Sequence, residues 1–373
     1  MSEVNPASLA PMVAWGAFAL AFVFGFVGNR TDFCTMGAVS DVVNMGDWNR
    51  MRMWLLSIAV AIIGANALEL AGVLKLSNSI YQTSNFTWLS YLVGGLLFGI
   101  GMTLGSGCGS KTLIRVGGGN LKSLVVLVFM AIAAYMTLRG LFGTLRVGVL
   151  EPVNVQLTTG QDLPSLLARW LGAERRVTEI AATVAVSGAL LGFVFAKREF
   201  LKLDYLLGGI IVGLVIVGGW YVSGGIGHVA EDPATLQEAW VATNTGRMES
   251  LSFVAPQAFL LELLMLWTDK SKIVTFGIAS ALGIVTGSAA YALASKRFRL
   301  ESFRDAPDMI RHIVGGILMG FGGVVALGCT IGQGITGFST LALGSILTFL
   351  AIVAGAAATM KYEYWRMLSD SKP

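Results

Sequence analysis

Long apolar runs separated by short polar or glycine-rich stretches recur along the whole chain. A helix that crosses a membrane needs about 20 predominantly apolar residues. Nine runs meet this requirement, and we predict a membrane-spanning helix in each: 11–28, 52–74, 88–106, 121–142, 177–196, 204–222, 273–294, 312–328 and 341–360. The pattern therefore predicts an all-α polytopic protein that forms a single integral membrane domain over residues 1–373.

Four further apolar segments are too short, or too interrupted by Gly and Pro, to cross alone: 33–45, 108–117, 249–267 and 329–338. We predict re-entrant half-helices in them. Such backbone is tolerated at membrane depth only where it is buried in protein or lines a cavity. For 249–267 a full additional span is the alternative.

An internal repeat relates the two halves of the chain. Val93–Gly101 aligns with Val314–Gly322, and in the same register Gly107-Cys108 aligns with Gly328-Cys329, at an offset of 221 residues without a gap. We predict a first repeat over 11–142, a connecting span at 177–196 and a second repeat over 204–360. Four spans per half and one between them require the second half to be inverted, an arrangement typical of transporters. The alternative is that spaced small residues recur in any membrane helix bundle.

The composition agrees with a membrane protein and excludes other classes. Hydrophobic residues make up 55% of the chain and charged residues 13%, whereas soluble domains are about 25% charged. The net charge of +4 does not indicate nucleic acid, because the basic residues cluster in short loops between apolar runs. The first eleven residues contain no Lys or Arg, so we expect no secretory signal peptide.

The same basic residues predict the orientation. Seventeen Lys and Arg fall on the side of the C-terminus and nine on the other side. Because cytoplasmic loops carry the excess of basic residues, we predict an inner-membrane protein with a periplasmic N-terminus and a cytoplasmic C-terminus. The segments of Cys34 and Cys108 then enter from the cytoplasm, and that of Cys329 enters from the periplasm.

The three cysteines, Cys34, Cys108 and Cys329, each lie beside a break in an apolar run. Their number is odd and there is no Cys-x-x-Cys, so a structural disulfide would leave one thiol over. Inert burial is one alternative, because Cys often behaves as a small hydrophobe. A soft-metal site is another, but His312 and His228 lie at a span entry and in an outer loop, and we expect neither metal nor cofactor.

A third interpretation is an anion pathway. Glycine-rich loops at Gly107-Cys108 and Gly328-Cys329 open half-helices whose first N–H groups are free to bind an anion. A thiol adds a weak donor and a polarizable surface, which favours an oxyanion that carries an exposed sulfur. The predicted pathway residues are Cys34, Cys108, Cys329, Gly107, Gly328, Gly332, Gln333 and Lys111.

Several charged residues lie near these segments. Lys111 either adds positive charge to the pathway or extends to the membrane interface. We expect Arg30 and Asp32 to pair with each other at the surface. Glu69 and Glu262 lie near predicted segment ends, where they would be solvated.

These motifs resemble the YeeE/YedE-type sulfur transport family over nearly the whole chain. The resemblance rests on Arg30-x-x-Phe33-Cys34, on the two glycine blocks that end in Gly107-Cys108 and Gly328-Cys329, and on Ser295-x-x-Phe298-Arg299. It implies nine spans with four half-helices and uptake of thiosulfate, relayed by S–H···S contacts at the three cysteines. It also implies a small cytoplasmic sulfur carrier of the TusA type as a partner. Gly109-Ser110-Lys111 departs from the small-Thr-Gly pattern that is more usual there.

A membrane thiol enzyme remains the alternative function. A sulfurtransferase or disulfide oxidoreductase would hold sulfur as a persulfide on Cys108, but such chemistry normally uses a resolving thiol close by. A passive channel is a third possibility. No ATP-binding P-loop is present in the sequence. We therefore predict a transporter rather than an enzyme.

Overall fold

The computed structural model describes residues 6–233 and 235–370. Within these residues, nine helices are long and apolar enough to cross a membrane. They are α1 Pro6–Arg30, α3 Asn49–Leu70, α4 Trp88–Leu104, α6 Leu121–Arg139, α9 Arg175–Phe195, α10 Leu203–Tyr221, α12 Phe276–Ala294, α13 Ala306–Val325 and α14 Leu343–Asp370. The predicted polytopic all-α fold is confirmed.

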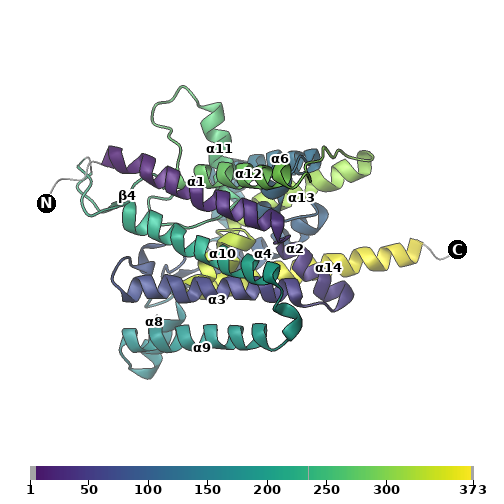
Figure 1. Ribbon diagram of the computed structural model, residues 1–373. Helices are drawn as coiled ribbons and strands as arrows, with labels where there is room; N and C mark the ends of the chain where they lie inside the picture. The colour runs from purple at the N-terminus through teal and green to yellow at the C-terminus, as the bar shows by residue number, and fades with distance from the viewer. Residues whose placement is uncertain (1–5, 234, 371–373) are drawn as a thin grey trace.

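The two ends of the chain lie on opposite sides of this bundle (Figure 1). We call the side where α1 begins the N-terminal face and the side where α14 ends the C-terminal face. In Figure 1 the long helices run roughly between these two faces, with α9 at one edge against α3.

Short helices lie where half-helices are predicted. They are α2 Thr35–Ser40 with η1 Asp41–Met45, α5 Gly109–Gly117, α11 Ala255–Met265 and η6 Gly332–Gly337. With 11 residues, α11 is too short to cross, so the alternative of a full span at 249–267 is wrong. The first six residues of that prediction are not helical.

The remaining elements are short and belong to connections. The helices are η2 Leu76–Asn78, α7 Leu141–Leu145, η3 Arg146–Leu150, α8 Leu163–Leu171, η4 Arg198–Phe200 and η5 Val222–Ile226. Strand β1 Asn85–Phe86 pairs antiparallel with β2 Val155–Gln156, and β3 His228–Val229 with β4 Ala239–Trp240.

Glycines let the central helices α4 and α13 approach closely. A Cβ added to Gly94 would lie 2.7 Å from the backbone nitrogen of Ala326, and one added to Gly315 would lie 2.5 Å from the nitrogen of Gly105. Such contacts allow backbone-to-backbone packing in a membrane, where apolar side chains gain nothing by leaving lipid. The glycine blocks of the sequence therefore form a helix crossing.

Buried aromatic rings fill the centre of the bundle beside the short helices. Phe24 lies 6.1 Å from Phe33 and 5.8 Å from Phe253, and Trp54 stacks on Phe349 at 5.0 Å between ring centroids. Large, stiff side chains of this kind fix the backbone around them. They thereby hold the starts of α2 and α11 in place.

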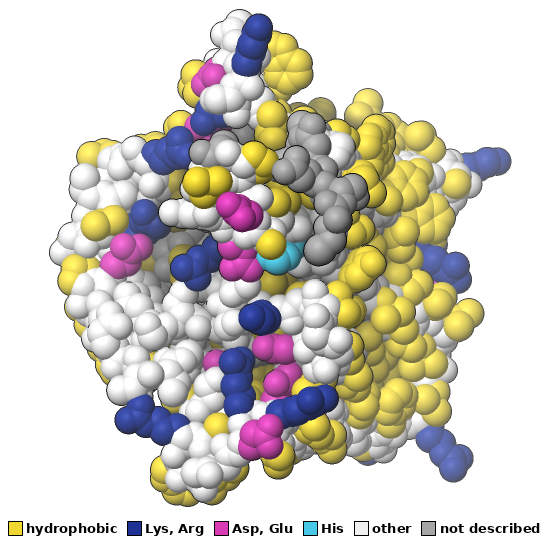
Figure 2. All heavy atoms as spheres, turned by 90° about the vertical axis from the view of Figure 1, so that its left-hand side faces the viewer, with side chains coloured by type: hydrophobic (Ala, Val, Ile, Leu, Met, Phe, Trp, Pro, Cys, Tyr) yellow, Lys and Arg dark blue, Asp and Glu magenta, His cyan; other side chains and the backbone are white. Residues whose placement is uncertain are grey.

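Apolar side chains cover the flank of the molecule. Figure 2 shows them gathered on the side of the bundle, whereas the N-terminal face turned to the viewer carries charged side chains. Val184, Leu214 and Leu350 on α9, α10 and α14 are among the exposed ones. An apolar belt between two polar faces is the surface expected of a protein embedded in a bilayer.

Candidate functional site

Each cysteine directly precedes a short helix. Cys34 is the N-cap of α2, Cys108 is the N-cap of α5, and Cys329 precedes the helical residues that begin at 330 and contain η6. Both N-cap cysteines have extended backbone. The first N–H groups of a helix have no partner within it, so all three thiols stand at helix ends that favour negative charge.

Two of the thiols accept hydrogen bonds from backbone N–H groups. The Cys34 Sγ accepts from the nitrogen of Gly37 at 3.3 Å, and the Cys329 Sγ accepts from Gly332 and Phe253, both at 3.4 Å. The Cys108 Sγ instead lies 3.3 Å from the hydroxyl of Ser110. A sulfur that accepts in this way keeps its S–H free to donate to another group.

The three cysteines are joined by a continuous row of contacts. Thr35, next to Cys34, places its hydroxyl 3.9 Å from the Cys108 Sγ. Gly109, next to Cys108, is so close to Phe253 that an added Cβ would lie 2.8 Å from its carbonyl oxygen. The nitrogen of Phe253 in turn donates to the Cys329 Sγ. Cys108 therefore lies between the other two along this row.

A cavity of about 680 Å³ opens on the C-terminal face and reaches Cys34. Its walls come from the ends of α1, α5 and α13, from α2 and η1, and from the segment before α13. Six Lys and Arg and four Asp and Glu line it: Arg50, Lys111, Arg115, Lys122, Arg297, Arg299, Asp32, Asp41, Glu301 and Asp308.

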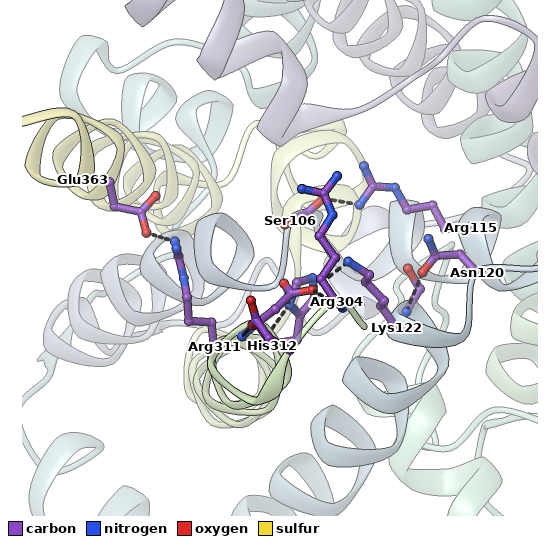
Figure 3. Close-up of polar contacts among 11 residues, drawn as sticks. Ser106, Arg115, Asn120, Lys122, Arg304, Arg311, His312 and Glu363 are labelled. Carbon is purple, nitrogen blue, oxygen red and sulfur yellow. Dashed lines mark hydrogen bonds and ion pairs between the residues drawn. The ribbon is translucent and has the colours of Figure 1, made fainter. Parts of the chain in front are cut away.

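The acidic residues neutralise only part of this positive charge. Lys111 pairs with Asp32 at 3.2 Å and Lys122 with Asp308 at 2.6 Å. Arg115 instead donates to the carbonyl oxygen of Ser106. Figure 3 shows this hydrogen bond together with the contacts of Lys122. Among the described residues no carboxylate pairs with Arg115, Arg297 or Arg299. The cavity is therefore suited to an anion.

A second, smaller cavity of about 130 Å³ lies on the other side of the cysteines, toward the N-terminal face. Gly328, which precedes Cys329, lines it together with Ala255 and Pro256 at the start of α11. Cys108 and Cys329 are 0% exposed, whereas Cys34 is 6% exposed. A packed layer that contains two of the three thiols thus separates the two cavities.

Comparison with known proteins places the chain in a family. The model of the family described as Sulphur transport matches residues 30–358. The chain belongs to this family. It is 28% identical over 326 residues to the thiosulfate transporter TsuA of Escherichia coli, covering 84% of each chain. It is 25% identical over 357 residues to the TsuA of Spirochaeta thermophila, covering 91% of this chain and 96% of the relative.

Membership of the Sulphur transport family confirms the prediction of a transporter and goes against the enzyme alternative. The resemblance found in the sequence motifs is likewise confirmed. All three cysteines and the other predicted pathway residues lie inside the matched range, 30–358. The family match does not by itself assign a role to any of them.

The other predicted pathway residues lie beside the cysteines in different ways. Gly107 packs against the side chain of Lys111, which is only 11% exposed. Gly332 lets Ser252 approach, because an added Cβ would lie 2.5 Å from its hydroxyl oxygen. Gln333 is buried, and its amide nitrogen donates to the carbonyl of Ala326. It stabilises the turn before Cys329 and does not line either cavity.

Three expectations about charged residues are wrong. Glu69 is not solvated: its side chain is 13% exposed and lies 3.4 Å from Arg175. Arg30 pairs with Asp204 at 3.4 Å, not with Asp32, because α10 begins beside the end of α1. Glu262 is not solvated: its side chain is 5% exposed and lies 3.0 Å from Arg139 and 2.8 Å from Lys272. A buried carboxylate needs such partners.

Sequence reasoning missed three residues that line the cavities. Arg115 follows Lys111 by four residues and so lies on the same face of α5, a signal that was available. Arg146 and Glu249, in the smaller cavity, belong to connections far apart in the chain. Only packing brings them together.

The histidines take part in carboxylate contacts. His228 lies 2.7 Å from Glu238, and His312 lies 3.2 Å from Asp308. Within residues 6–233 and 235–370, no group of three or more His, Cys, Asp or Glu is arranged to hold a metal ion.

Proposed function

We propose that this protein takes up thiosulfate, or a closely related sulfur-containing anion, along a pathway formed by Cys34, Cys108 and Cys329. The observation that carries the proposal is the row of contacts that joins the three thiols between two cavities on opposite sides. The relatives are thiosulfate transporters by name, which supports the same substrate here.

The chemistry of the row suits such an anion. Helix N-termini hold negative charge without a buried cation, which would be costly at membrane depth. Each thiol offers an S–H donor and a polarizable sulfur to the terminal sulfur of the anion. The anion passes from Cys329 to Cys108 to Cys34 by exchange of hydrogen bonds, with no covalent bond made or broken.

The closed layer around Cys108 requires a movement during transport, and the inverted repeat supplies one. We propose that residues 11–142 and 204–360 are related by a two-fold axis, with 177–196 as a connecting helix. In support, α1 packs on α12 as α10 packs on α3, and α4 packs on α14 as α13 packs on α6. Exchanging the two halves converts the first contact of each comparison into the second. Movement of one half against the other could therefore open the N-terminal face and the C-terminal face alternately.

The orientation follows from the distribution of charge. We propose that the protein lies in the inner membrane with the N-terminal face in the periplasm and the C-terminal face in the cytoplasm. The basic cavity then receives the anion after Cys34. Arg297 and Arg299 at this face, which pair with no carboxylate among the described residues, would suit docking of a small cytoplasmic carrier of the TusA type.

Replacement of Cys108 tests the pathway. Cys108→Ala removes the middle S–H donor, and loss of a hydrogen bond to a charged ligand costs about 1.5–3 kcal/mol. We therefore expect uptake of labelled thiosulfate into proteoliposomes to fall by about ten- to a hundredfold. Cys108→Ser, which keeps a donor, should retain intermediate uptake.

The control is Thr286→Ala, at an exposed position of α12, which should transport like the unmodified protein. A host that lacks sulfate uptake should grow on thiosulfate with this control and fail to grow with Cys108→Ala. Unchanged growth with a correctly folded Cys108→Ala protein would contradict the pathway.

A further inference from the structure

A carboxylate lies beside the proposed route on its N-terminal side. Glu249 belongs to the connection between β4 and α11 and lines the 130 Å³ cavity that reaches Gly328. Its backbone is held by Ser223: the Glu249 nitrogen donates to the Ser223 hydroxyl at 3.1 Å, and this hydroxyl donates to the Glu249 carbonyl. The side chain is thus presented to the cavity from a fixed backbone.

Glu249 and Arg146 both carry buried atoms without partners. The Oε1 of Glu249 and the Nε of Arg146 are out of contact with solvent and make no hydrogen bond within the described residues. Arg146 pairs instead through another nitrogen with Glu151, at 3.5 Å. Buried polar groups are usually satisfied, so two orphaned atoms in one cavity indicate a site for a polar ligand.

The charged and titratable side chains that line this cavity come from three connections. Arg146 belongs to η3, Glu249 precedes α11, and Tyr81 lies between η2 and β1; the other lining residues are uncharged. Burial raises the pKa of Tyr81 far above its ordinary value, and Glu249 adds to this. Tyr81 is therefore neutral at physiological pH, and the charge in the cavity depends on Arg146 and Glu249.

A further cavity lies next to this site. It measures about 300 Å³, shares the walls Asn244 and Phe259 with the smaller cavity, and contains Arg139 and Lys272 around Glu262. Two cations against one carboxylate make this cavity positive. An anion attracted there would next meet Arg146 and Glu249 before it reaches Cys329.

An ionised Glu249 would oppose that step. The smaller cavity has room for roughly four water molecules, so a dianion and a carboxylate there would repel each other with little screening. Burial raises the pKa of Glu249 to about 8, although the backbone N–H of Asn244 lowers it. Near neutral pH, Glu249 therefore already favours the uncharged form that an anion requires.

We propose that Glu249 is a proton-binding site coupled to anion binding in this cavity. The anion lies beside the Arg146 guanidinium in this cavity, and the Glu249 carboxyl group binds a proton when the anion is bound. The site deepens the proposed function, on which it rests for the identity of the anion. Because coupling is reciprocal, the anion raises the proton affinity of Glu249, and protonation tightens anion binding.

Infrared titration of the purified protein from pH 5 to 10 tests the site without transport. We expect one component of the protonated-carboxyl absorption to disappear with a midpoint near 8. This component should be absent from Glu249→Gln and retained in Glu238→Gln, where the replaced acid is exposed and lies between β3 and β4. Sodium thiosulfate should raise the midpoint by about one unit, which equals about tenfold tighter anion binding to the protonated form.

Arg146→Gln serves as a second variant that keeps the carboxyl group. Loss of the guanidinium should abolish the effect of thiosulfate on the midpoint, while the carboxyl group of Glu249 still titrates. In proteoliposomes, uptake by the unmodified protein should fall as the external pH rises through 8, whereas uptake by Glu249→Gln should not change with pH in this range.

The outcomes separate this proposal from the proposed function. If thiosulfate moves the midpoint but is not transported, the proton site stands and the uptake function fails. If Glu249 titrates near its ordinary value of 4.5, if thiosulfate leaves the midpoint unchanged, or if Glu249→Gln keeps the pH dependence of uptake, the coupled proton site is overturned.

Discussion

At the scale of single residues, the polarizable thiol groups and the positive charges that would contact an anion come from different side chains. Cys34 reaches the basic cavity, where Lys111 and Arg115 are among the charged groups that act on its thiol. Cys108 and Cys329 lie deeper, and their hydrogen-bond partners among the described residues are hydroxyl and backbone groups. The thiols therefore suit recognition of a terminal sulfur, and the basic residues at the opening suit attraction of negative charge.

Lys111→Met tests the role of charge at the opening. The partner, Asp32, is largely exposed and would be solvated after the change, so we expect little loss of stability. The cavity would lose one positive charge, and we expect the KM for thiosulfate to rise about tenfold, the effect of one charged hydrogen bond. Lys111→Arg should restore most of the affinity.

The matched control is Lys361→Met, at an exposed position of α14 outside the cavity. Kinetics of uptake into proteoliposomes measure both variants. An unchanged KM for Lys111→Met would mean that this lysine serves the membrane interface and not the pathway.

At the scale of elements, close helix crossings carry the fold. At the crossing of α4 and α13, glycines from both helices contact the backbone of the other: Gly94 meets Gly322, and Gly101 meets Gly315. A side chain at these positions has no space, because the neighbouring atoms are backbone and cannot rotate away. The glycines of the sequence repeat are thus required by packing.

Gly315→Ala should destabilise the protein. Its Cβ would lie 2.5 Å from the nitrogen of Gly105, and overpacking of this kind costs about 1–3 kcal/mol. Gly188→Ala is the matched control, since Gly188 is also helical but has nothing within 4 Å of an added Cβ. That control should be neutral or stabilising by up to about 1 kcal/mol through helix propensity.

Thermal unfolding in detergent compares the two substitutions. We expect a lower Tm for Gly315→Ala and an equal or higher Tm for Gly188→Ala. Equal losses in both would show that helix propensity, and not the crossing, sets the effect.

At the scale of the whole molecule, two cavities approach the cysteines from opposite faces and a packed layer separates them. The cavity on the C-terminal face is wide and reaches Cys34, whereas the one toward the N-terminal face ends at Gly328. Of the three thiols, Cys34 alone lines one of the cavities described above. This asymmetry gives the proposed orientation a direct test.

A membrane-impermeant maleimide should modify Cys34 from the C-terminal face. Reaction requires an accessible thiol, so Cys108 and Cys329 should remain unmodified. With the proposed orientation, we expect labelling in inside-out vesicles and none in right-side-out spheroplasts. Cys34→Ser should abolish the labelling, and the reverse pattern would place the C-terminus outside.

Much of this architecture was predictable from the sequence. Nine apolar runs determined nine crossing helices, because a bilayer requires about 20 apolar residues in each. The breaks at 33–45, 108–117 and 329–338 predicted short helices with a cysteine before each. These features are local, and local composition is enough to determine them.

Boundaries and partners depended on the tertiary structure. Helix α11 begins only at Ala255, with Pro256 in its first turn. The residues before it are held by other elements: the Ser250 hydroxyl donates to the carbonyl of Ile216, and the carbonyl of Leu251 accepts from the Thr336 hydroxyl. The pairing of Arg30 with Asp204 likewise depends on how α10 packs beside α1.

The sequence by itself therefore determined the membrane class, the spans and the three thiols at helix starts. Packing alone decided that Thr35 meets Cys108, that Phe253 meets Cys329, and that Arg146 and Glu249 share one cavity. The physical reason is that hydropathy and helix breaks act over neighbouring residues, whereas a site at membrane depth is assembled from segments that only the folded bundle brings within reach.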